Sequence, residues 1–373
     1  MNTTPFDNVK GKLGFGFMRL PQKDGQVDLE HTQQMVDAFL ANGFTYFDTA
    51  HGYLNGQCES YLKTCLTSRY PRESYILADK LSHYHFENEE DILPLFQNQL
   101  DLSGVDYFDF YLMHAQNRAN YEKYRRCHAY EIALRLREEG KIRHFGISFH
   151  DKAEFLEKIL NDYPQIEVVQ LQFNYADYED PSVESRKCYE VCCRYGKPVI
   201  VMEPVKGGSL VNLPPAAQAI FDGLNGGSAA SYAIRFAAGF ENVKMVLSGM
   251  SSLAMMEENC SFMKDFRPLD KREQCAVEQV QAIFRSQDLI ACTACRYCTP
   301  HCPQGILIPD LFSCYNVKKQ WNTWNPDFYY SNVYTKDGGK ASSCIKCGAC
   351  EDLCPQHLAI RTLLEDVAKE FEK

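Results

Sequence analysis

The stretch that decides the fold is YILADKLSHYHFENEEDILPLFQNQLDLSGVDYFDFYLMH, residues 75–114. It starts with one apolar run, Ile76–Lys80, and ends with another, Phe108–His114. Between them, Ile92–Leu100 carries apolar residues at the period of a helix. Two buried strands joined by a crossover helix lie parallel in one sheet. The stretch therefore predicts one β/α unit and the start of the next.

The same alternation of apolar runs and helical patterns extends from residue 13 to about residue 263. The other predicted strands are Leu13–Met18, Tyr46–Asp48, Phe145–Ser148, Val168–Phe173, Pro198–Met202 and Val243–Leu247. The other predicted helices are Leu29–Leu40, Glu59–Leu66, Tyr130–Glu139, Ala153–Leu160, Val183–Tyr195, Ala229–Ala238 and Leu253–Met263. Eight β/α units predict a closed (β/α)₈ barrel, the TIM barrel, over residues 1–263.

Four polar residues stand at or just after the ends of successive predicted strands, where barrels of this class carry their chemistry. Asp48 ends the second strand, and Tyr53 follows five residues later. Lys80 ends the third strand and His114 the fourth. Each residue alone is ordinary: a lone histidine, for example, is usually a structural hydrogen-bonding group. Together they predict a catalytic site at the barrel mouth.

These residues resemble the aldo-keto reductase family, whose catalytic tetrad is Asp, Tyr, Lys and His at these strand ends. The resemblance covers roughly residues 8–263. It implies an oxidoreductase that reduces a small carbonyl compound, or oxidises the alcohol, with a nicotinamide as hydride carrier. Its other matching segments are GKLGFGFMRLP (11–21), GKIRHFGIS (140–148), VVQLQFNY (168–175) and MEPVKGG (202–208).

The chemistry of the tetrad follows from its residue types. A phenol has an unperturbed pKa of about 10, which is too high for efficient proton donation at neutral pH. Lys80 is therefore expected to lower the pKa of Tyr53, and Asp48 to hold Lys80 charged and oriented. His114 is expected to orient and polarise the carbonyl oxygen. Tyr53 would then donate the proton.

The resemblance also implies a site for NAD(P). Ser148 and Gln170 match residues that hydrogen-bond the carboxamide. Lys206, Gly207 and Gly208 form a loop that could approach the pyrophosphate, since glycine lets backbone N–H groups come close to phosphate. A tight barrel turn would equally explain those glycines. The residues that match the phosphate and adenosine site are Gly249, Met250, Ser251, Ser252, Glu258 and Asn259.

The chain departs from the family pattern at three positions of this site. Phe149 stands where an Asn usually follows the Ser. Gly249 and Met255 stand where NADPH-specific relatives carry Lys and Arg against the 2′-phosphate. Without those cations the resemblance does not imply a preference for NADPH over NADH.

A doubled cysteine pattern decides the fold of the C-terminal part. The first run ends in Pro303 and the second in Pro355. This spacing is typical of [4Fe-4S] ligation, and in two-cluster proteins the fourth cysteine of each run binds the other cluster. The sequence therefore predicts two [4Fe-4S] clusters. The predicted ligands are Cys292, Cys295, Cys298 and Cys302 in the first run and Cys344, Cys347, Cys350 and Cys354 in the second.

Structural zinc sites and a disulfide framework are the alternatives. Zinc sites usually use two C-x-x-C pairs separated by a longer loop, which leaves the third cysteine and the prolines unexplained. The other nine of the 17 cysteines are scattered without a pattern. Such free thiols favour a reducing compartment, so we expect a cytoplasmic protein with clusters.

The segment between the two runs, residues 304–343, is too long for a compact ferredoxin. Ile308–Phe312 is a plausible helix start, with Pro309 and Asp310 in its first turn. We predict a connecting helix over 264–286 and a mostly helical two-[4Fe-4S] ferredoxin-like domain over 287–373. An aromatic group either covers a cluster or forms a docking face. It consists of Trp321, Trp324, Phe328, Tyr329 and Tyr330.

Charge and hydropathy exclude several partner classes. The net charge of −10 disfavours nucleic acid, whose phosphates attract clustered Lys and Arg. No apolar run approaches the roughly 18 residues that a membrane span needs, and the start lacks the pattern of a signal peptide. The sequence gives no oligomeric state.

The combination of barrel and clusters leaves three functional hypotheses. A nicotinamide-dependent reductase could link its electrons to the clusters, with a ferredoxin-type electron carrier as a candidate partner. A cluster-driven reductase could work without nicotinamide, with Tyr53 still as proton donor. An electron-transfer subunit could use the barrel as a scaffold, although a scaffold has no need of the tetrad.

Overall fold

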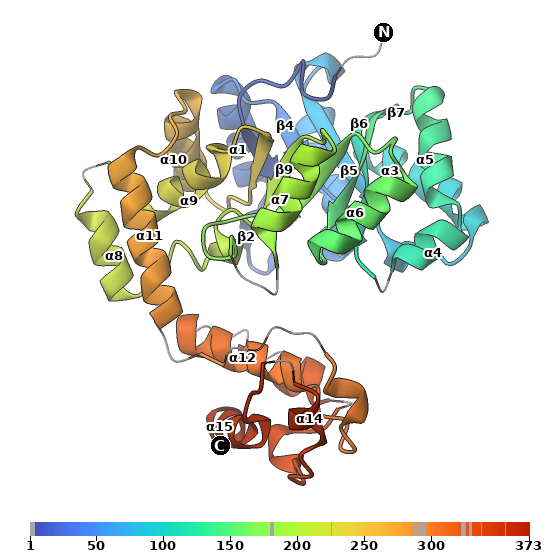
Figure 1. Cartoon of the computed structure of the whole chain (residues 1–373). Helices are drawn as coiled ribbons and strands as arrows, with labels where there is room; N and C mark the ends of the chain where they lie inside the picture. Colours follow the sequence, from blue (N-terminus) through green and yellow to red (C-terminus); the bar gives the residue numbers. More distant parts are fainter. Residues whose placement is uncertain are drawn as a thin grey trace. The chain divides into compact units, whose positions relative to one another are not determined.

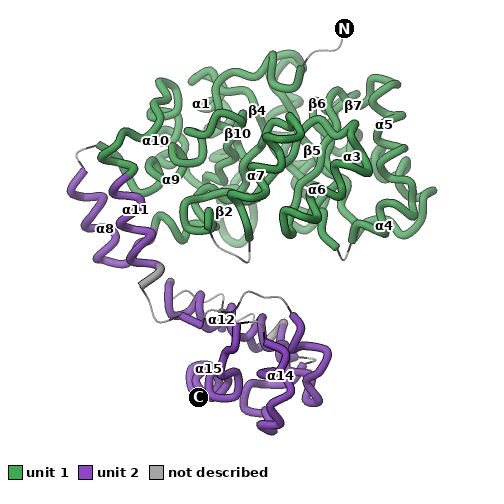
Figure 2. Tube along the Cα trace, viewed as in Figure 1, with its two compact units in different colours: residues 1–211, 226–274 green, residues 212–225, 275–373 purple. Residues whose placement is uncertain are grey.

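The computed structural model describes residues 4–373 apart from 119, 180–182, 225, 287–288, 291, 293–295, 322–325, 328–329, 337 and 355. The chain divides into two compact units (Figure 2). The first contains residues 1–211 and 226–274, and the second contains residues 212–225 and 275–373.

The first unit is a closed barrel of eight parallel strands, which confirms the predicted fold class. Neighbouring strands follow one another in sequence order around the barrel, and β1 closes it against β10. The strands are β1 (Leu13–Gly16), β4 (Tyr46–Asp48), β5 (Ile76–Leu81), β6 (Phe108–Gln116), β7 (Ile142–Phe149), β8 (Val168–Gln172), β9 (Val199–Met202) and β10 (Val243–Ser248).

Amphipathic helices cover the outside of the barrel (Figure 1). Capping side chains fix several helix starts: Asp28 accepts a hydrogen bond from His31 N at 3.0 Å, and Ser228 accepts one from Ser231 N at 3.1 Å. The helices are α1 (Leu29–Ala41), α2 (Cys58–Leu62), α3 (Ile92–Ser103), α4 (Tyr121–Arg126), α5 (Ala129–Glu138), α6 (Ala153–Asp162), α7 (Ser185–Arg194), α9 (Ala229–Ala238) and α10 (Leu253–Lys264), with α11 (Lys271–Ser286) after them.

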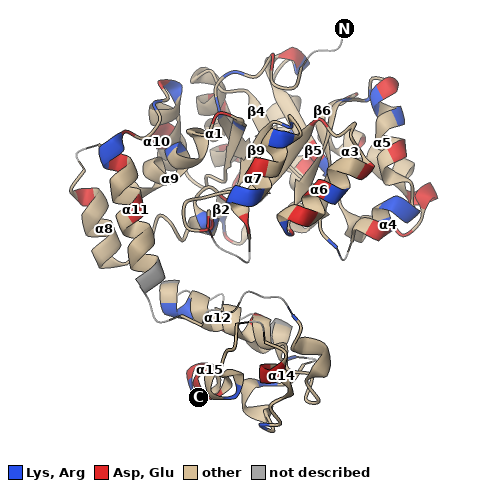
Figure 3. Cartoon of the chain, in the orientation of Figure 1, with Lys and Arg blue, Asp and Glu red and all other residues tan. Residues whose placement is uncertain are grey.

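The outward faces of the helices carry charges of both signs. Figure 3 shows Lys and Arg interspersed with Asp and Glu on α5, α6 and α7. Each of these helices has an ion pair one turn apart, at Arg135–Glu139, Lys158–Asp162 and Arg186–Glu190. The opposite, apolar faces pack on the strands, which is the pattern that made these helices recognisable in the sequence.

The interior of the barrel is filled with side chains and is not a channel. Phe110, Leu112 and Val168 belong to this interior cluster, and Phe6 from the N-terminal segment packs against it. The ring centroids of Phe6 and Phe110 lie 5.0 Å apart. The strand ends at the opposite side therefore remain as the place for a site.

Several local elements differ from the predictions. Phe17–Arg19 forms a 3₁₀ turn where the first strand was expected to continue. The helix after Tyr53 changes to a π-helical turn at Lys63–Thr67. The hairpin of β2 (Gln22–Lys23) and β3 (Gln26–Val27), helix α4 and helix α8 (Pro215–Asp222) were not predicted. These pieces are too short for a periodic apolar pattern.

The second unit has its own small core and is mostly helical. Its helices are α8, most of α11, α12 (Ile308–Trp321), α14 (Ala349–Asp352) and α15 (Ile360–Phe371). Ile306, Leu311 and Phe312 pack with Leu364 and Val367 of α15. Helix α12 starts at the predicted position. Among the described residues, no helix has the length and apolar character needed to cross a membrane.

Candidate active site

The four predicted tetrad residues meet at the mouth of the barrel. Lys80 Nζ donates to Asp48 Oδ1 at 2.6 Å and to the Thr49 carbonyl at 2.8 Å. The same Nζ lies 5.2 Å from the ring centroid of Tyr53. The rings of Tyr53 and His114 meet edge to face with centroids 5.8 Å apart. The loop after β4 and the ends of β5 and β6 therefore bring a phenol, an ammonium group and an imidazole together.

The ammonium group of Lys80 is fully buried and remains charged. Burial alone would lower the pKa of Lys80, but Asp48 and Tyr53 more than offset it, so the pKa lies above its ordinary value. Asp48 thus holds a positive charge against the Tyr53 ring, as the sequence suggested.

The pKa of Tyr53 departs from the expectation. Burial raises the pKa of Tyr53, and the attraction of Lys80 offsets only part of this increase. Lys80 therefore acts in the expected direction, but burial has the larger effect and the pKa of Tyr53 lies above its ordinary value. The phenol keeps its proton throughout the neutral pH range.

His114 is a neutral imidazole next to Tyr53. Burial, followed by the charge of Lys80, lowers the pKa of His114 well below its ordinary value. Its Nδ1 lies 2.5 Å from Ser82 Oγ. A neutral ring held by Ser82 can offer Nε2 to a carbonyl oxygen without adding a charge.

The two residues expected to bind the carboxamide are direct neighbours. Ser148 of β7 and Gln170 of β8 are paired in register, and both are buried. Ser148 Oγ accepts a hydrogen bond from Ala115 N at 2.7 Å. Gln170 Oε1 is buried and has no hydrogen-bond partner among the described residues. An amide donor of a bound group would satisfy it.

Phe149 cannot supply the polar contact that the usual Asn makes. Its side chain is 2% exposed and packs in the apolar layer that also contains Leu171 and Phe155. Its ring therefore stabilises the fold, and Ser148 and Gln170 are left to make the polar contacts.

The loop after β9 has an unusual backbone. Lys206, Gly207 and Gly208 all have positive φ angles, of 48°, 64° and 100°. Glycine adopts this region without strain, which explains two of the three residue types. Lys206 Nζ forms an ion pair with the buried Asp177, which holds the loop in place.

Sequence reasoning missed Arg19, an exposed cation of the 3₁₀ turn after β1. A Cβ atom at Gly207 would lie 3.4 Å from Arg19 Nη2, and one at Gly249 would lie 3.2 Å from Arg19 Cδ. The side chain therefore runs between the loops after β9 and β10. The only sequence signal was its place in the matching segment GKLGFGFMRLP.

The remaining nucleotide-site candidates surround the start of α10. Ser252 is the N-cap of this helix, and its Oγ accepts from Met255 N at 3.3 Å. The buried Asn259 donates to Ser248 Oγ at 2.9 Å. Gly249, Ser251 and Glu258 are exposed. These candidates therefore lie after β10, where Gly249 is close to the Arg19 side chain.

Cysteines of the two runs line two hollows in the second unit. Cys344, Cys347 and Cys350 line the first together with Cys302 from the other run. The structure thus brings the fourth cysteine of the first run to the second run.

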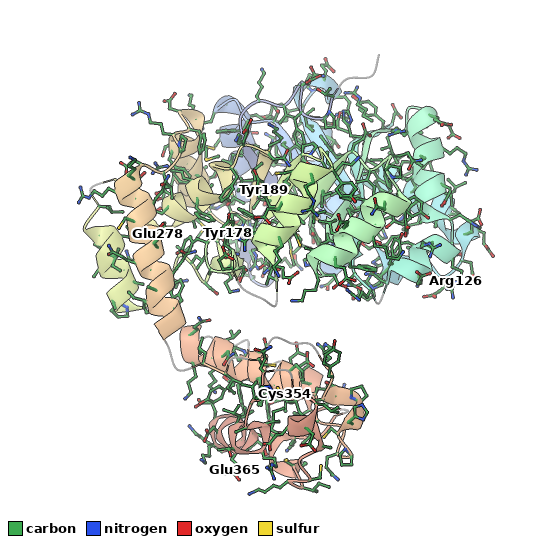
Figure 4. The ribbon with its side chains drawn as sticks, in the orientation of Figure 1. Arg126, Tyr178, Tyr189, Glu278, Cys354 and Glu365 are labelled. Carbon is green, nitrogen blue, oxygen red and sulfur yellow. The ribbon has the colours of Figure 1, made fainter. Side chains whose placement is uncertain are left out.

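The second hollow has the reciprocal composition. Cys292 and Cys298 line it together with Cys354, which Figure 4 labels. Cys295 lies outside the described residues. Apolar side chains close this hollow, including Pro309 and Phe312 of α12 and Leu358. Of the aromatic group, Tyr330 is buried in the core of this unit; nothing is described of the side chains of Trp321, Trp324, Phe328 and Tyr329.

Equivalent backbone turns shape the two runs. The residue after the second cysteine has a positive φ in both, at Arg296 (63°) and Gly348 (85°). Arg296 is held by two contacts to Asp310, at 2.7 and 2.6 Å. Arg361, which lines the first hollow, is paired with Glu351. These pairs fix the loops that carry the cysteines.

Comparison with known proteins finds a matching family for each of the two parts. The Aldo/keto reductase family matches residues 12–282, and a 4Fe-4S dicluster domain matches residues 291–359. The chain belongs to the aldo/keto reductase family. An aldo-keto reductase from Mycobacterium sp. (strain KMS) is 27% identical over 206 residues, which cover 54% of this chain and 67% of the relative.

Solved aldo-keto reductase structures share the barrel. One from Klebsiella pneumoniae, in complex with NADPH, has a TM-score of 0.61 and 18% sequence identity. The match covers 72% of this chain and 90% of the Klebsiella chain. The holo form of one from Bacillus halodurans has a TM-score of 0.59 and 23% identity, covering 72% and 91%. This aldo-keto reductase therefore has the barrel of these structures, followed by a dicluster domain.

Proposed function

We propose that this aldo-keto reductase interconverts a small carbonyl compound and its alcohol at the barrel mouth, with Tyr53 as the proton donor and NAD(P) as the hydride carrier. We further propose that its two [4Fe-4S] clusters exchange electrons with this site or with a ferredoxin-type carrier. The arrangement of Asp48, Lys80, Tyr53 and His114 carries the first part of the proposal.

The roles of the four side chains follow from their contacts. Asp48 fixes the charge of Lys80, which faces the Tyr53 ring. As the phenol proton moves to the substrate oxygen, that ammonium group would stabilise the negative charge left on the Tyr53 oxygen. The neutral His114 ring positions the oxygen, because Ser82 holds its other nitrogen.

The residues present fit a nicotinamide nucleotide. When bound, it would supply or accept the hydride. Ser148 and Gln170 would hold the carboxamide, because Gln170 Oε1 is a buried acceptor without a donor. Lys206, Gly207 and Gly208 would approach the pyrophosphate, and Arg19 would supply a cation there. Gly249, Ser251, Ser252, Glu258 and Asn259 would hold the adenosine part.

The cysteine hollows fit two cubane clusters better than zinc. Each hollow is lined by cysteines from both runs, the arrangement typical of two-cluster ligation. When bound, each cluster would supply one-electron transfer. The ligands would be Cys344, Cys347, Cys350 and Cys302 for one cluster, and Cys292, Cys295, Cys298 and Cys354 for the other.

An anaerobic substrate screen tests the proposal. Carbonyl compounds are added to the holoenzyme with NADH or NADPH, and nucleotide oxidation is followed by absorbance. We expect oxidation that depends on both the carbonyl compound and Tyr53. If carbonyl reduction proceeds equally well with dithionite-reduced clusters and no nucleotide, the result would contradict the nicotinamide-dependent reaction and support the cluster-driven alternative.

A further inference from the structure

The strand pairing beside the tetrad stops one residue before His114. Strands β5 and β6 pair in register up to Leu81 and Met113. On the other side of β6, the register with β7 shifts between Met113 and Gln116. His114 and Ala115 therefore lie within an irregularity of the strand, and irregularities such as β-bulges re-aim side chains next to active sites. Buried backbone groups at such a place need partners other than the neighbouring strand.

Ala115 has a backbone conformation that is unusual for a residue with a Cβ atom. Its φ of 53° lies in the left-handed region, which persists only where the surroundings hold it. The Ala115 N–H donates to Ser148 Oγ at 2.7 Å, and the Ala115 carbonyl accepts from Asn120 Nδ2 at 2.6 Å. Asn120 directly precedes α4, but its side chain does not cap that helix. The buried Asn120 amide thus holds the turn beside His114.

The hydroxyl group of Tyr124 contacts both strand ends at once. Tyr124 belongs to α4 and is 0% exposed. Its hydroxyl oxygen lies 2.6 Å from the Leu81 carbonyl oxygen and 2.9 Å from the His114 carbonyl oxygen. Burial raises the pKa of Tyr124, so the hydroxyl keeps the proton that it donates. One phenol therefore joins the ends of β5 and β6 where their pairing has stopped.

These contacts close a loop around the His114 imidazole. Leu81 is followed by Ser82, whose Oγ lies 2.5 Å from His114 Nδ1. The Tyr124 hydroxyl thus holds the backbone next to both partners of that hydrogen bond. Since Ser82 engages Nδ1, the Nε2 atom is left for a substrate oxygen. The placement of the ring therefore depends on Tyr124 as well as on Ser82.

We propose that Tyr124 and Asn120 are positioning residues: they hold the backbone of His114 and Ala115, and thereby place the His114 ring for the carbonyl substrate and Ser148 for the nicotinamide carboxamide. This inference rests on the proposed function. Because Ser148 Oγ accepts from the Ala115 N–H, its own O–H is left to donate to the carboxamide. One irregularity of β6 therefore connects the proton-transfer site with the nucleotide site.

The split between kcat and KM tests the role of Tyr124. Tyr124→Phe removes the hydroxyl and keeps the ring. Misplacement of a catalytic group can cost up to about 10²-fold in rate, so kcat for carbonyl reduction should fall by up to that factor with little change in nucleotide KM. Tyr121→Phe is the matched control, because Tyr121 is a buried residue of the same helix whose hydroxyl donates to Asp162 at 2.7 Å. Parental kcat in both variants would overturn the proposal.

A double-mutant cycle separates positioning from general stability. If Tyr124 acts through His114, the effects of the two substitutions are not additive. Tyr124→Phe should therefore cause little further loss of kcat in the His114→Gln background. A purely structural role would lower kcat by the same factor in both backgrounds, and that result would also overturn the proposal.

Asn120→Ala is a second, milder variant, which keeps the test available if Tyr124→Phe does not fold. It removes one donor to the Ala115 carbonyl, but Asn117 Nδ2 still donates to this carbonyl at 3.1 Å. Since Ala115 also contacts Ser148, we expect Asn120→Ala to raise nucleotide KM as well as to lower kcat. Parental values of both quantities would contradict the role of Asn120.

Histidine NMR tests the positioning without turnover. Spectra are recorded on the anaerobic holoenzyme with ¹³C-labelled histidine, and the His114 signal is identified by its loss in His114→Gln. This signal should shift or broaden in Tyr124→Phe and stay in place in Tyr121→Phe. An unmoved His114 signal in Tyr124→Phe would overturn the proposal. A shifted signal in a protein that reduces no carbonyl compound would support the positioning and contradict only the proposed reaction.

Discussion

Tyr53 holds its proton more tightly than a free tyrosine, because burial outweighs the attraction of Lys80. A donor of this kind works only when charge develops on the substrate oxygen next to it. The buried Lys80–Asp48 pair is preorganised for the proton transfer, because its ammonium group is already held near the Tyr53 ring. The properties of Tyr53, Lys80 and Asp48 thus favour a site complementary to the transition state.

Replacing Tyr53 by Phe removes the proposed proton donor and leaves the ring. General acid catalysis contributes about 10²–10⁴-fold, so kcat for carbonyl reduction should fall by about that factor. Nucleotide KM should change little. The matched control is Tyr61→Phe in α2, whose hydroxyl contacts Gln57. Parental kcat in Tyr53→Phe would remove the assignment.

The pH dependence of reduction follows from two pKa directions. His114 has a pKa well below 6.5, so its protonation should cause no loss of kcat between about pH 8 and 6. Tyr53 must be protonated, and its pKa is raised, so kcat should fall only above about pH 10. A kcat profile measured from pH 6 to 10.5 checks both limits. An inflection near pH 6.5 that disappears in His114→Gln would contradict the neutral imidazole.

Arg19 provides a prediction on nucleotide binding. Its side chain lies along Gly207 and Gly249, so Arg19→Gln should raise the KM for NADH or NADPH while kcat stays near the parental value. A lost charged hydrogen bond costs about 1.5–3 kcal/mol, which corresponds to roughly 10–150-fold in affinity. The control is Lys23→Gln, an exposed cation of the β2–β3 hairpin. Unchanged nucleotide KM in Arg19→Gln would exclude the contact.

At the scale of elements, the two cysteine runs exchange their last members. Cys302 lines the hollow of the second run, and Cys354 lines that of the first. Helix α12 lies between the runs in sequence and lines both hollows through Ile308. The two hollows are therefore built as one structural unit.

Double variants distinguish exchanged from unexchanged ligation. Cys302→Ser with Cys347→Ser removes two residues of one hollow, so iron per chain should fall by about half. Cys302→Ser with Cys292→Ser affects both hollows and should remove nearly all iron. Cys314→Ala, in α12 but lining neither hollow, is the control. The reverse pattern of iron contents would show that each run binds its own cluster.

The sequence predicted elements better than it predicted contacts. The eight strands and most long helices carry periodic apolar patterns, and these appeared where they were expected. Short pieces such as the Phe17–Arg19 turn have no period to detect. Arg19 was missed because its role depends on neighbours from other elements. The lowering effect of Lys80 on the pKa of Tyr53 was predicted, but the larger effect of burial was not, because burial depends on the folded structure.

At the scale of the whole molecule, one chain combines two kinds of redox domain: the aldo/keto reductase match covers residues 12–282 and the dicluster match covers residues 291–359. In the proposed function the first would transfer two electrons as hydride and the second would transfer single electrons. Two one-electron centres match the two electrons of one hydride. This stoichiometry is the reason to expect that barrel and clusters work together.

Anaerobic reduction of the clusters by nicotinamide tests this central claim most directly. NADH or NADPH is added to the purified holoenzyme, and the cluster absorbance and the reduced-cluster EPR signal are recorded. We predict that at least one nucleotide bleaches the absorbance and produces the signal. Bleaching by dithionite but by neither nucleotide would contradict the link between barrel and clusters.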